Sequence, residues 1–146
     1  MYMNENPRRF NQLTEKLRQR GYRMTPQRLA LIRLIAASQH HPGAAELFAS
    51  VRTQHPTMSL ATVYKTIELL KDLNEIIEIN LQDVSHYDGS KPYSHPHVIC
   101  IKCRIIIDGD MDDSVSKLVL EVEQNMKFKV QKHQLNFYGL CSACQE

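Results

Sequence analysis

The chain has 146 residues, of which 42% are hydrophobic and 23% charged, which is typical of a soluble folded protein with one domain or two small ones. A run of about 18 apolar residues is absent, which excludes a membrane span. The N-terminus lacks the apolar core and cleavage site of a secretory signal, so we expect a cytoplasmic protein.

The net charge is only +2, but residues 1–33 hold eight basic and two acidic residues, a local charge of +6 that leaves −4 for the rest. The basic residues of this arm are Arg8, Arg9, Lys16, Arg18, Arg20, Arg23, Arg28 and Arg33. An arm of this kind suggests a polyanionic partner, because each neutralised phosphate releases counterions. A solvated face of two helices is the alternative interpretation.

Helical signals run through the N-terminal half of the chain. Leu13 and Leu17 predict a first helix over residues 11–20. Thr25 and Pro26 open a second helix, since threonine caps an N-terminus and proline fits the first turn. A third helix is expected over residues 44–53. Ser59 is the expected cap of a fourth, over residues 60–73, whose apolar face would consist of Val63, Ile67, Leu70 and Leu73.

After the fourth helix the hydrophobic period changes to that of a strand. Residues 76–81 fit one short strand, and residues 84–88 fit its return partner. The pattern of helices followed by a β-hairpin predicts a winged helix-turn-helix whose fourth helix enters the DNA major groove. We therefore expect a DNA-binding domain over residues 1–82 and a hinge over residues 83–93.

Residues 94–146 are expected to form an α/β domain, which makes the fold class α+β. Strands are predicted at residues 97–100, 105–107, 127–134 and 135–140. A helix is predicted over residues 114–126, with an inward face of Val115, Leu118, Val119 and Val122.

Four cysteines form two C-x-x-C pairs, Cys100 with Cys103 and Cys141 with Cys144. Each pair makes a tight knuckle that aims two thiolates at one point, and two knuckles complete the tetrahedron that Zn(II) prefers. Such a site has no open position, so it is structural. A redox dithiol and unligated buried cysteines are the alternatives, and the presence of two pairs favours zinc.

A second set of metal-binding residue types surrounds His95 and His97. Residues two apart on a strand point to one face, so both imidazoles can reach one ion. Asp88 precedes them, Asp108 follows them, and His41 lies between two helices of the DNA-binding half. This mixed set suits Fe(II) or Mn(II), and zinc could also bind. The alternative is a scatter of polar loop residues, and spacing by itself does not bring in His41.

Four segments together resemble the ferric uptake regulator family in order and spacing, from about residue 8 to the C-terminus. These segments are MTPQR at 24–28, SLATVY at 59–64, HPHVICIKC at 95–103 and FYGLCSAC at 137–144. The resemblance implies a bacterial repressor, not an enzyme, that binds palindromic double-stranded operator DNA as a homodimer when a divalent metal is loaded. Residues 94–146 would then be its dimerisation domain.

The resemblance also implies roles for particular residues. The four cysteines match the family's structural zinc ligands. The regulatory site of the peroxide-sensing branch is matched by His41, Asp88, His95, His97 and Asp108. Metal would clamp the two domains into a DNA-competent geometry. Tyr64 resembles a base-contacting tyrosine that packs on a thymine methyl. Thr62 and Lys65 would face phosphates or base edges. Phosphates would also be bound by Arg18, Arg20 and Arg23.

Asp108 is the main indicator of the branch, because iron-sensing members usually carry glutamate there. They also carry a second site flanking the histidines, where this chain has Ser94 and Pro96. A zinc-sensing member would usually offer a cysteine, and none is free. The resemblance therefore implies that Fe(II) and hydrogen peroxide oxidise His41 or His95 and release DNA, whereas Mn(II) gives an insensitive repressor.

Alternatives remain open. The interval from Asp88 to His95 is one residue longer than usual, which leaves Asp83 and His86 as substitutes for Asp88. An Fe(II)- or Mn(II)-responsive uptake regulator without peroxide sensing is a second reading of the same site. A metalloenzyme would need a nucleophile or general base that the sequence does not offer. A zinc-ribbon interaction module would lack salt-dependent binding to duplex DNA.

Overall fold

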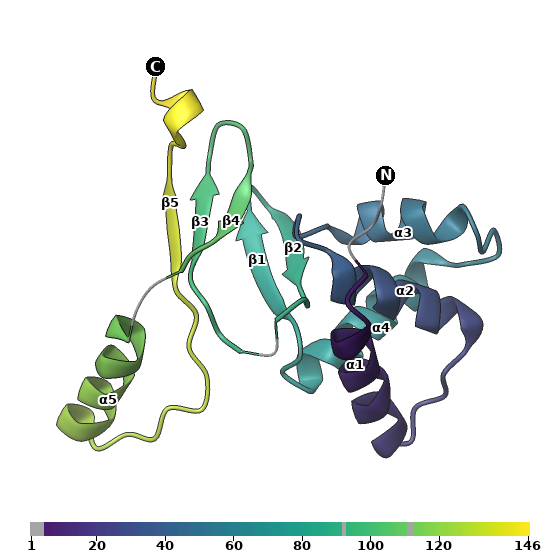
Figure 1. The fold of residues 1–146 in the computed structure, drawn as a ribbon, viewed down its shortest axis with the longest axis horizontal. Helices are drawn as coiled ribbons and strands as arrows, with labels where there is room; N and C mark the ends of the chain where they lie inside the picture. Colours follow the sequence, from purple (N-terminus) through teal and green to yellow (C-terminus); the bar gives the residue numbers. More distant parts are fainter. Residues whose placement is uncertain (1–4, 92, 111–112) are drawn as a thin grey trace. The chain divides into compact units, whose positions relative to one another are not determined.

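Helices and a hairpin, in the predicted order, occupy the first part of the computed structural model, which describes residues 5–91, 93–110 and 113–146 (Figure 1). The chain divides into a unit of residues 1–92 and a unit of residues 93–146. Residues 84–88 of the segment expected as a hinge form a strand of the first unit. Among the described residues, no helix is both long and apolar enough to cross a bilayer.

The helices of the first unit are α1 (Pro7–Gln19), α2 (Pro26–Ala37), α3 (Ala44–Arg52) and α4 (Leu60–Asp72). Three of them begin at a side-chain cap, where Asn6, Thr25 or Ser59 accepts a hydrogen bond from the amide three residues later. The caps at Thr25 and Ser59 confirm the prediction. Asn6 starts α1 earlier than predicted, because Pro7 fits the first turn behind that cap.

The core of the first unit lies among the four helices and the base of the hairpin. Its members include Leu13, Leu17, Leu31, Ile32, Ile35, Leu47, Val51, Met58, Val63, Ile67, Leu70, Ile76 and Tyr87. The predicted apolar face of α4 is buried except at Leu73, which is half-buried. Because this face turns inward, Tyr64 and Lys65 on the same helix are exposed.

The hairpin pairs β1 (Ile77–Leu81) with β2 (Val84–Asp88) in antiparallel register. Its two turn residues, Gln82 and Asp83, have φ angles of 50° and 62°, as a tight two-residue hairpin turn requires. Asp83 therefore lies at the tip of the hairpin, whereas Asp88 lies at its base opposite Ile77.

In the second unit, β3 (His97–Cys100) is the middle strand of a sheet of order β4-β3-β5. Strand β4 (Ile106–Asp108) is antiparallel to β3, and β5 (Asn136–Gly139) is parallel to it. The long crossover that a parallel pair needs contains α5 (Ser114–Met126). The strand predicted over residues 127–134 is wrong, since these residues form no ladder and are mostly exposed.

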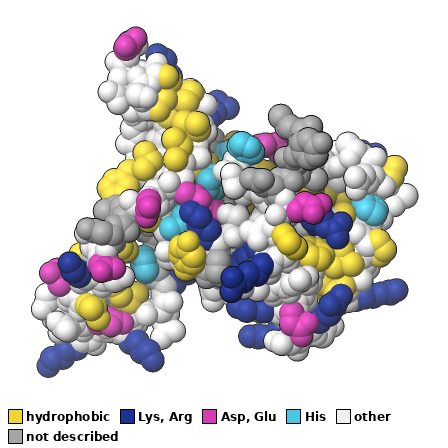
Figure 2. Space-filling model, viewed as in Figure 1, with side chains coloured by type: hydrophobic (Ala, Val, Ile, Leu, Met, Phe, Trp, Pro, Cys, Tyr) yellow, Lys and Arg dark blue, Asp and Glu magenta, His cyan; other side chains and the backbone are white. Residues whose placement is uncertain are grey.

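The predicted inward face of α5 is only partly covered: Val115, Val119 and Val122 are half-buried, Leu118 is exposed, and none of this helix's described residues is fully buried. Leu118 and Leu120 are both more than half exposed. One face of the sheet is open in the same way: Val98 pairs with Ile107 on β4 and with Phe137 on β5, and each is about half exposed. Hydrophobic side chains accordingly appear on the surface over β5 (Figure 2).

Candidate metal centres and nucleic-acid interface

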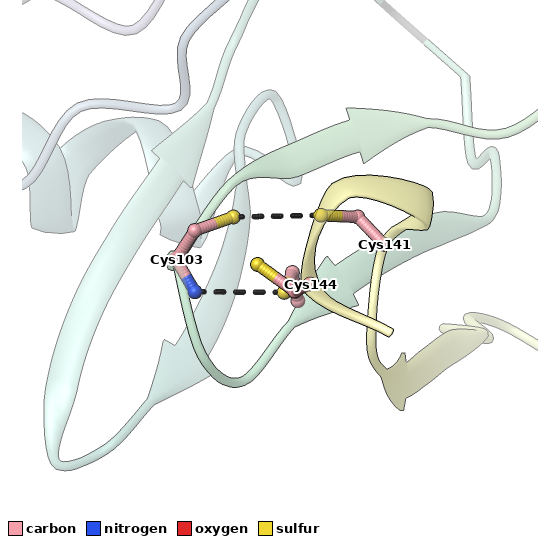
Figure 3. A group of neighbouring side chains, drawn as sticks. Cys103, Cys141 and Cys144 are labelled. Atoms are coloured by element: carbon pink, nitrogen blue, oxygen red, sulfur yellow. Dashed lines mark hydrogen bonds between the residues drawn. The ribbon is translucent and has the colours of Figure 1, made fainter. Parts of the chain in front are cut away.

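The four cysteines come together in the second unit, where their sulfur atoms all lie within 4.8 Å of one another. The first knuckle is the turn after β3, in which the Cys103 amide donates to Cys100 Sγ at 3.5 Å. The second follows β5, where a short 3-10 helix, η1 (Ser142–Cys144), turns Cys141 and Cys144 toward the first knuckle (Figure 3).

Distances in this cluster fit a tetrahedral metal site better than a disulfide. Cys103 Sγ and Cys141 Sγ are 3.7 Å apart. Four sulfurs about 2.3 Å from one zinc ion would be about 3.8 Å apart, whereas a disulfide bond is about 2.05 Å long. The observed spacing, with all four sulfurs within 4.8 Å of one another, therefore fits four thiolates around one ion and excludes a disulfide between Cys103 and Cys141.

The charge of the cysteine cluster also favours a dication. Backbone amides of Cys141 and Cys103 hydrogen-bond to the Cys100 sulfur and lower the pKa of that thiol to about 6. The hydrogen bond with the Cys141 sulfur, together with burial, raises the pKa of Cys144 to about 12. The protein by itself thus stabilises some thiolates at the expense of others, and a bound Zn(II) would remove their mutual repulsion.

His41 and Asp88 form a buried pair in the first unit. His41 Nε2 lies 3.1 Å from Asp88 Oδ2, and the two side chains are 2% and 1% exposed. Asp88 Oδ1 accepts hydrogen bonds from the amide and hydroxyl of Ser90. Asp83 lies at the far end of the hairpin and is exposed, so the structure brings Asp88, and not Asp83, to His41.

Asp108 meets both histidines of the H-x-H motif in the second unit. Asp108 Oδ1 lies 3.2 Å from His95 Nε2 and 3.5 Å from His97 Nε2. Strand pairing explains the second contact, because His97 is directly opposite Asp108. His95 precedes β3 rather than lying on it, and its Nδ1 bonds to the Tyr93 carbonyl oxygen at 3.0 Å, which turns Nε2 toward Asp108.

These distances match the spacing of ligand atoms that share an ion. Nitrogen and oxygen ligands about 2.1 Å from a metal and at right angles to each other are about 3 Å apart. The His41–Asp88 pair and the His95–His97–Asp108 group each have this spacing. Imidazole and carboxylate donors are the set that Fe(II), Mn(II) and Zn(II) accept.

The residues predicted to contact DNA lie on the exposed side of α4 and near α1. Tyr64 is 48% exposed, Lys65 is exposed and Thr62 is half-buried, with its hydroxyl 2.8 Å from that of Ser59. The side chains of Arg18, Arg20 and Arg23 are all exposed. Dark blue Lys and Arg side chains are visible over the helical part of this unit (Figure 2).

Not every cation of the basic arm faces solvent. Arg9 is 3% exposed and forms an ion pair with buried Glu75 at 2.9 Å, and Lys16 binds the same carboxylate. Arg33 remains exposed, with its guanidinium 4.9 Å from the centre of the Phe10 ring. The surface charge of the arm is therefore smaller than the sequence count indicates.

Two further residues contact the predicted ligands, and the sequence analysis assigns this contact to neither of them. His86 was considered as a ligand, but its Nδ1 lies 3.0 Å from the His41 carbonyl oxygen. Ser90 holds the Asp88 carboxylate; its position two residues after an aspartate is typical of a local side-chain turn, which is the signal that could have found it.

A helix-turn-helix with an adjoining hairpin, followed by a unit that contains a four-cysteine metal site, defines a winged-helix DNA-binding regulator with a metal-binding C-terminal unit. A profile of the ferric uptake regulator family matches residues 19–138. The chain is 34% identical over 143 residues to the ferric uptake regulation protein of Bacillus subtilis, covering 93% of this chain and 94% of the relative.

The peroxide-responsive repressor PerR of Staphylococcus saprophyticus is 35% identical over 132 residues, covering 89% of this chain and 87% of the relative. The ferric uptake regulator of Helicobacter pylori has the same fold, with a TM-score of 0.77, 23% identity and coverage of 100% of this chain and 98% of that one. The chain belongs to the ferric uptake regulator family, whose members are metal-responsive transcription regulators rather than enzymes and act on DNA as dimers.

Proposed function

We propose that the chain is a homodimeric repressor that binds operator DNA when a regulatory Fe(II) or Mn(II) is loaded and that senses hydrogen peroxide through Fe(II). The proposed regulatory ligands are His41, Asp88, His95, His97 and Asp108. Structural Zn(II) would be bound by Cys100, Cys103, Cys141 and Cys144. The observation that supports the proposal of peroxide sensing is the aspartate at position 108, one carboxylate oxygen of which lies near two imidazoles.

The donor chemistry supports a metal that joins the two units. His41 with Asp88 supplies one imidazole and one carboxylate, and the second unit supplies two imidazoles and one carboxylate. Each group alone provides fewer donors than Fe(II) and Mn(II) accept. An ion bound by both groups would restrict the units to one arrangement, and DNA that binds this arrangement better would shift the equilibrium toward it.

Bound Fe(II) would supply the one-electron chemistry by which hydrogen peroxide oxidises an adjacent imidazole, whereas Mn(II) would not. His41 and His95 are the imidazoles expected to gain oxygen. Both are buried, at 2% and 7% exposure, so an oxidant formed at the metal would meet them before it met bulk solvent. An oxidised imidazole is a poorer metal ligand, and loss of this ligand would release the DNA.

Exposed apolar residues of the second unit support a dimer. The row of Ile107, Val98 and Phe137 runs across all three strands, and α5 also exposes Leu118 and Leu120. A 13-residue helix with no buried side chain gains little from tertiary packing within its own chain. Apolar surface of this extent is typical of an interface, and a second copy of the chain would bury it.

The exposed side of α4 supports major-groove binding. Tyr64 and Lys65 point away from the core, so a phenol ring is available for a thymine methyl and an ammonium for a phosphate. Thr62 stands near the N-terminus of the helix, and Arg18, Arg20 and Arg23 would position the duplex through its phosphates. Lys71 pairs with Glu68 and Glu78, so it contributes less to this surface.

The decisive experiment is gel-shift binding to an AT-rich palindromic duplex with Mn(II) or with anaerobic Fe(II), before and after hydrogen peroxide. We expect both metals to support binding and peroxide to abolish binding in the Fe(II) sample alone. Mass spectrometry should then find added oxygen on the peptide of His41 or His95. Binding that survives peroxide with either metal would instead favour an iron or manganese uptake regulator, as in the Bacillus subtilis relative's name.

Two variants make this experiment specific. His41→Ala should lose metal-dependent DNA binding and keep its zinc. The control is His40→Ala, which alters the adjacent, exposed histidine. Asp108→Glu should keep the metal response and lose peroxide sensitivity, with the exposed Asp110→Glu as its control. If histidine oxidation in Asp108→Glu is as extensive as in the wild type, Asp108 is not the basis for peroxide sensing.

A further inference from the structure

The backbone at His41 adopts a conformation that its surroundings must specify. Its φ angle is 54°, in the left-handed region that few non-glycine residues adopt. It also precedes Pro42, whose ring restricts the residue before it. Such conformations persist where neighbouring contacts determine them, and His41 is 2% exposed.

Residues 41–43 lie along the free edge of β2 like a short additional strand. The Tyr87 amide donates to the Pro42 carbonyl oxygen at 3.0 Å, and Gly43 forms an antiparallel bridge with His86. A Cβ atom on Gly43 would lie 3.2 Å from the Ser85 carbonyl oxygen, so the absence of a side chain permits this close approach. The segment is therefore attached to the strand that ends in Asp88.

His86 completes this attachment through its side chain. Its Nδ1 lies 3.0 Å from the His41 carbonyl oxygen. Because a carbonyl oxygen accepts hydrogen bonds and does not donate them, Nδ1 of His86 carries the hydrogen. On the other side of His41, the ring Nε2 faces Asp88 Oδ2 at 3.1 Å. The backbone and the ring of His41 are thus each held by a residue of β2.

We propose that His86 is a positioning residue for the regulatory metal: its imidazole holds the His41 backbone so that His41 Nε2 stays beside Asp88 Oδ2. This inference rests on the proposed function, in which His41 and Asp88 are metal ligands. His86 acts through the His41 carbonyl and supplies no ligand atom. Without it, the His41 segment would have to be ordered when the metal binds, which weakens affinity for the ion and leaves the loaded state unchanged.

The test compares His86→Leu with His86→Asn in the zinc-loaded full-length protein. The asparagine amide nitrogen lies near the position of the histidine Nδ1 and donates a hydrogen bond, whereas leucine has no donor. Electron paramagnetic resonance of free Mn(II) measures the affinity for Mn(II). His86→Leu should bind Mn(II) about fivefold more weakly, within the roughly 2- to 12-fold range of one hydrogen bond, and His86→Asn should remain within about twofold of the wild type.

DNA binding separates positioning from a general defect of the hairpin. With the AT-rich palindromic duplex, His86→Leu should need more Mn(II) for half-maximal binding, while its DNA affinity at saturating Mn(II) should equal that of the wild type. A lower DNA affinity at saturation with unchanged Mn(II) affinity would overturn the proposal. Equal weakening in His86→Asn would also overturn it, because the imidazole would then bind the metal itself.

His41→Ala distinguishes failure of this inference from failure of the proposed function. If His41→Ala weakens Mn(II) binding and His86→Leu does not, the positioning role is wrong and the proposed site stands. If His41→Ala binds Mn(II) like the wild type, the proposed site fails, and the positioning role fails with it. If His86→Leu loses zinc or unfolds, His86→Asn is compared with His86→Gln, whose amide is displaced by one bond and should weaken Mn(II) binding.

Discussion

The buried Arg9–Glu75 pair should be a major contributor to the stability of the DNA-binding unit. Arg9 donates from Nη1 to Glu75 Oε2 at 2.9 Å, from Nη2 to the Glu75 carbonyl at 2.7 Å and from Nε to the Gly89 carbonyl at 2.8 Å. These bonds connect α1 to the residues just before β1 and just after β2, at the base of the hairpin. Arg9→Met removes all three and leaves the Glu75 carboxylate buried.

Removing one partner of a buried ion pair costs about 3–5 kcal/mol, because the other charge remains without compensation. Lys16 still binds Glu75 in the variant, so we expect the lower end, about 3 kcal/mol. At about 4–8 °C per kcal/mol for a unit of this size, the melting temperature should fall by about 12–24 °C.

Urea unfolding followed by circular dichroism at 222 nm measures this loss, since α1–α4 carry most of the helical signal. The control is Arg8→Met, which alters the adjacent exposed arginine and should change stability by less than about 0.5 kcal/mol. Arg9→Met/Glu75→Leu should recover part of the loss, because it removes both charges. A loss of less than about 1 kcal/mol in Arg9→Met would refute the reasoning.

Three further predictions concern packing and zinc. Gly89→Ala should destabilise the protein by about 1–3 kcal/mol in the same urea assay, because the new Cβ would lie 2.3 Å from Ile35 Cγ2. The control is Gly139→Ala, whose new Cβ has no atom within 4 Å and which should leave stability unchanged. Equal effects of the two substitutions would contradict this packing argument. Cys141→Ser should lose zinc by atomic emission and dissociate in size-exclusion chromatography, and a zinc-loaded dimer would rule out the assignment. Zinc titrations at pH 7.5 in buffers of different ionisation enthalpy should show release of about three protons, since Cys100, with a pKa of about 6, is already ionised; release close to four would contradict that pKa.

Local sequence features determined the parts of the structure that depend on near neighbours. The caps at Thr25 and Ser59 act on amides three residues away, and the buried face of α4 follows from helical spacing. The two cysteine knuckles follow from the C-x-x-C spacing in the same way. These features could be predicted because the interacting atoms lie within about one turn of the chain.

The tertiary structure decided the features that join distant residues. Arg9 binds the Gly89 carbonyl 80 positions later, and His86 binds the His41 carbonyl across 45 positions. A sequence pattern shows that these residues are polar, but it does not show whether folding buries them against a partner. That reason explains why Arg9 was counted with the surface charge and why His86 was considered as a ligand.

Residues 114–140 show the same limit for apolar residues. Periodicity predicted the bounds of α5 correctly, since helix formation depends on local spacing. It did not show how far the predicted face is covered, because burial needs a second surface: Val115, Val119 and Val122 are only half-buried and Leu118 is exposed. Residues 127–134 have strand-like composition but pair with no other strand of the described chain, and a strand exists only where its backbone finds a ladder partner.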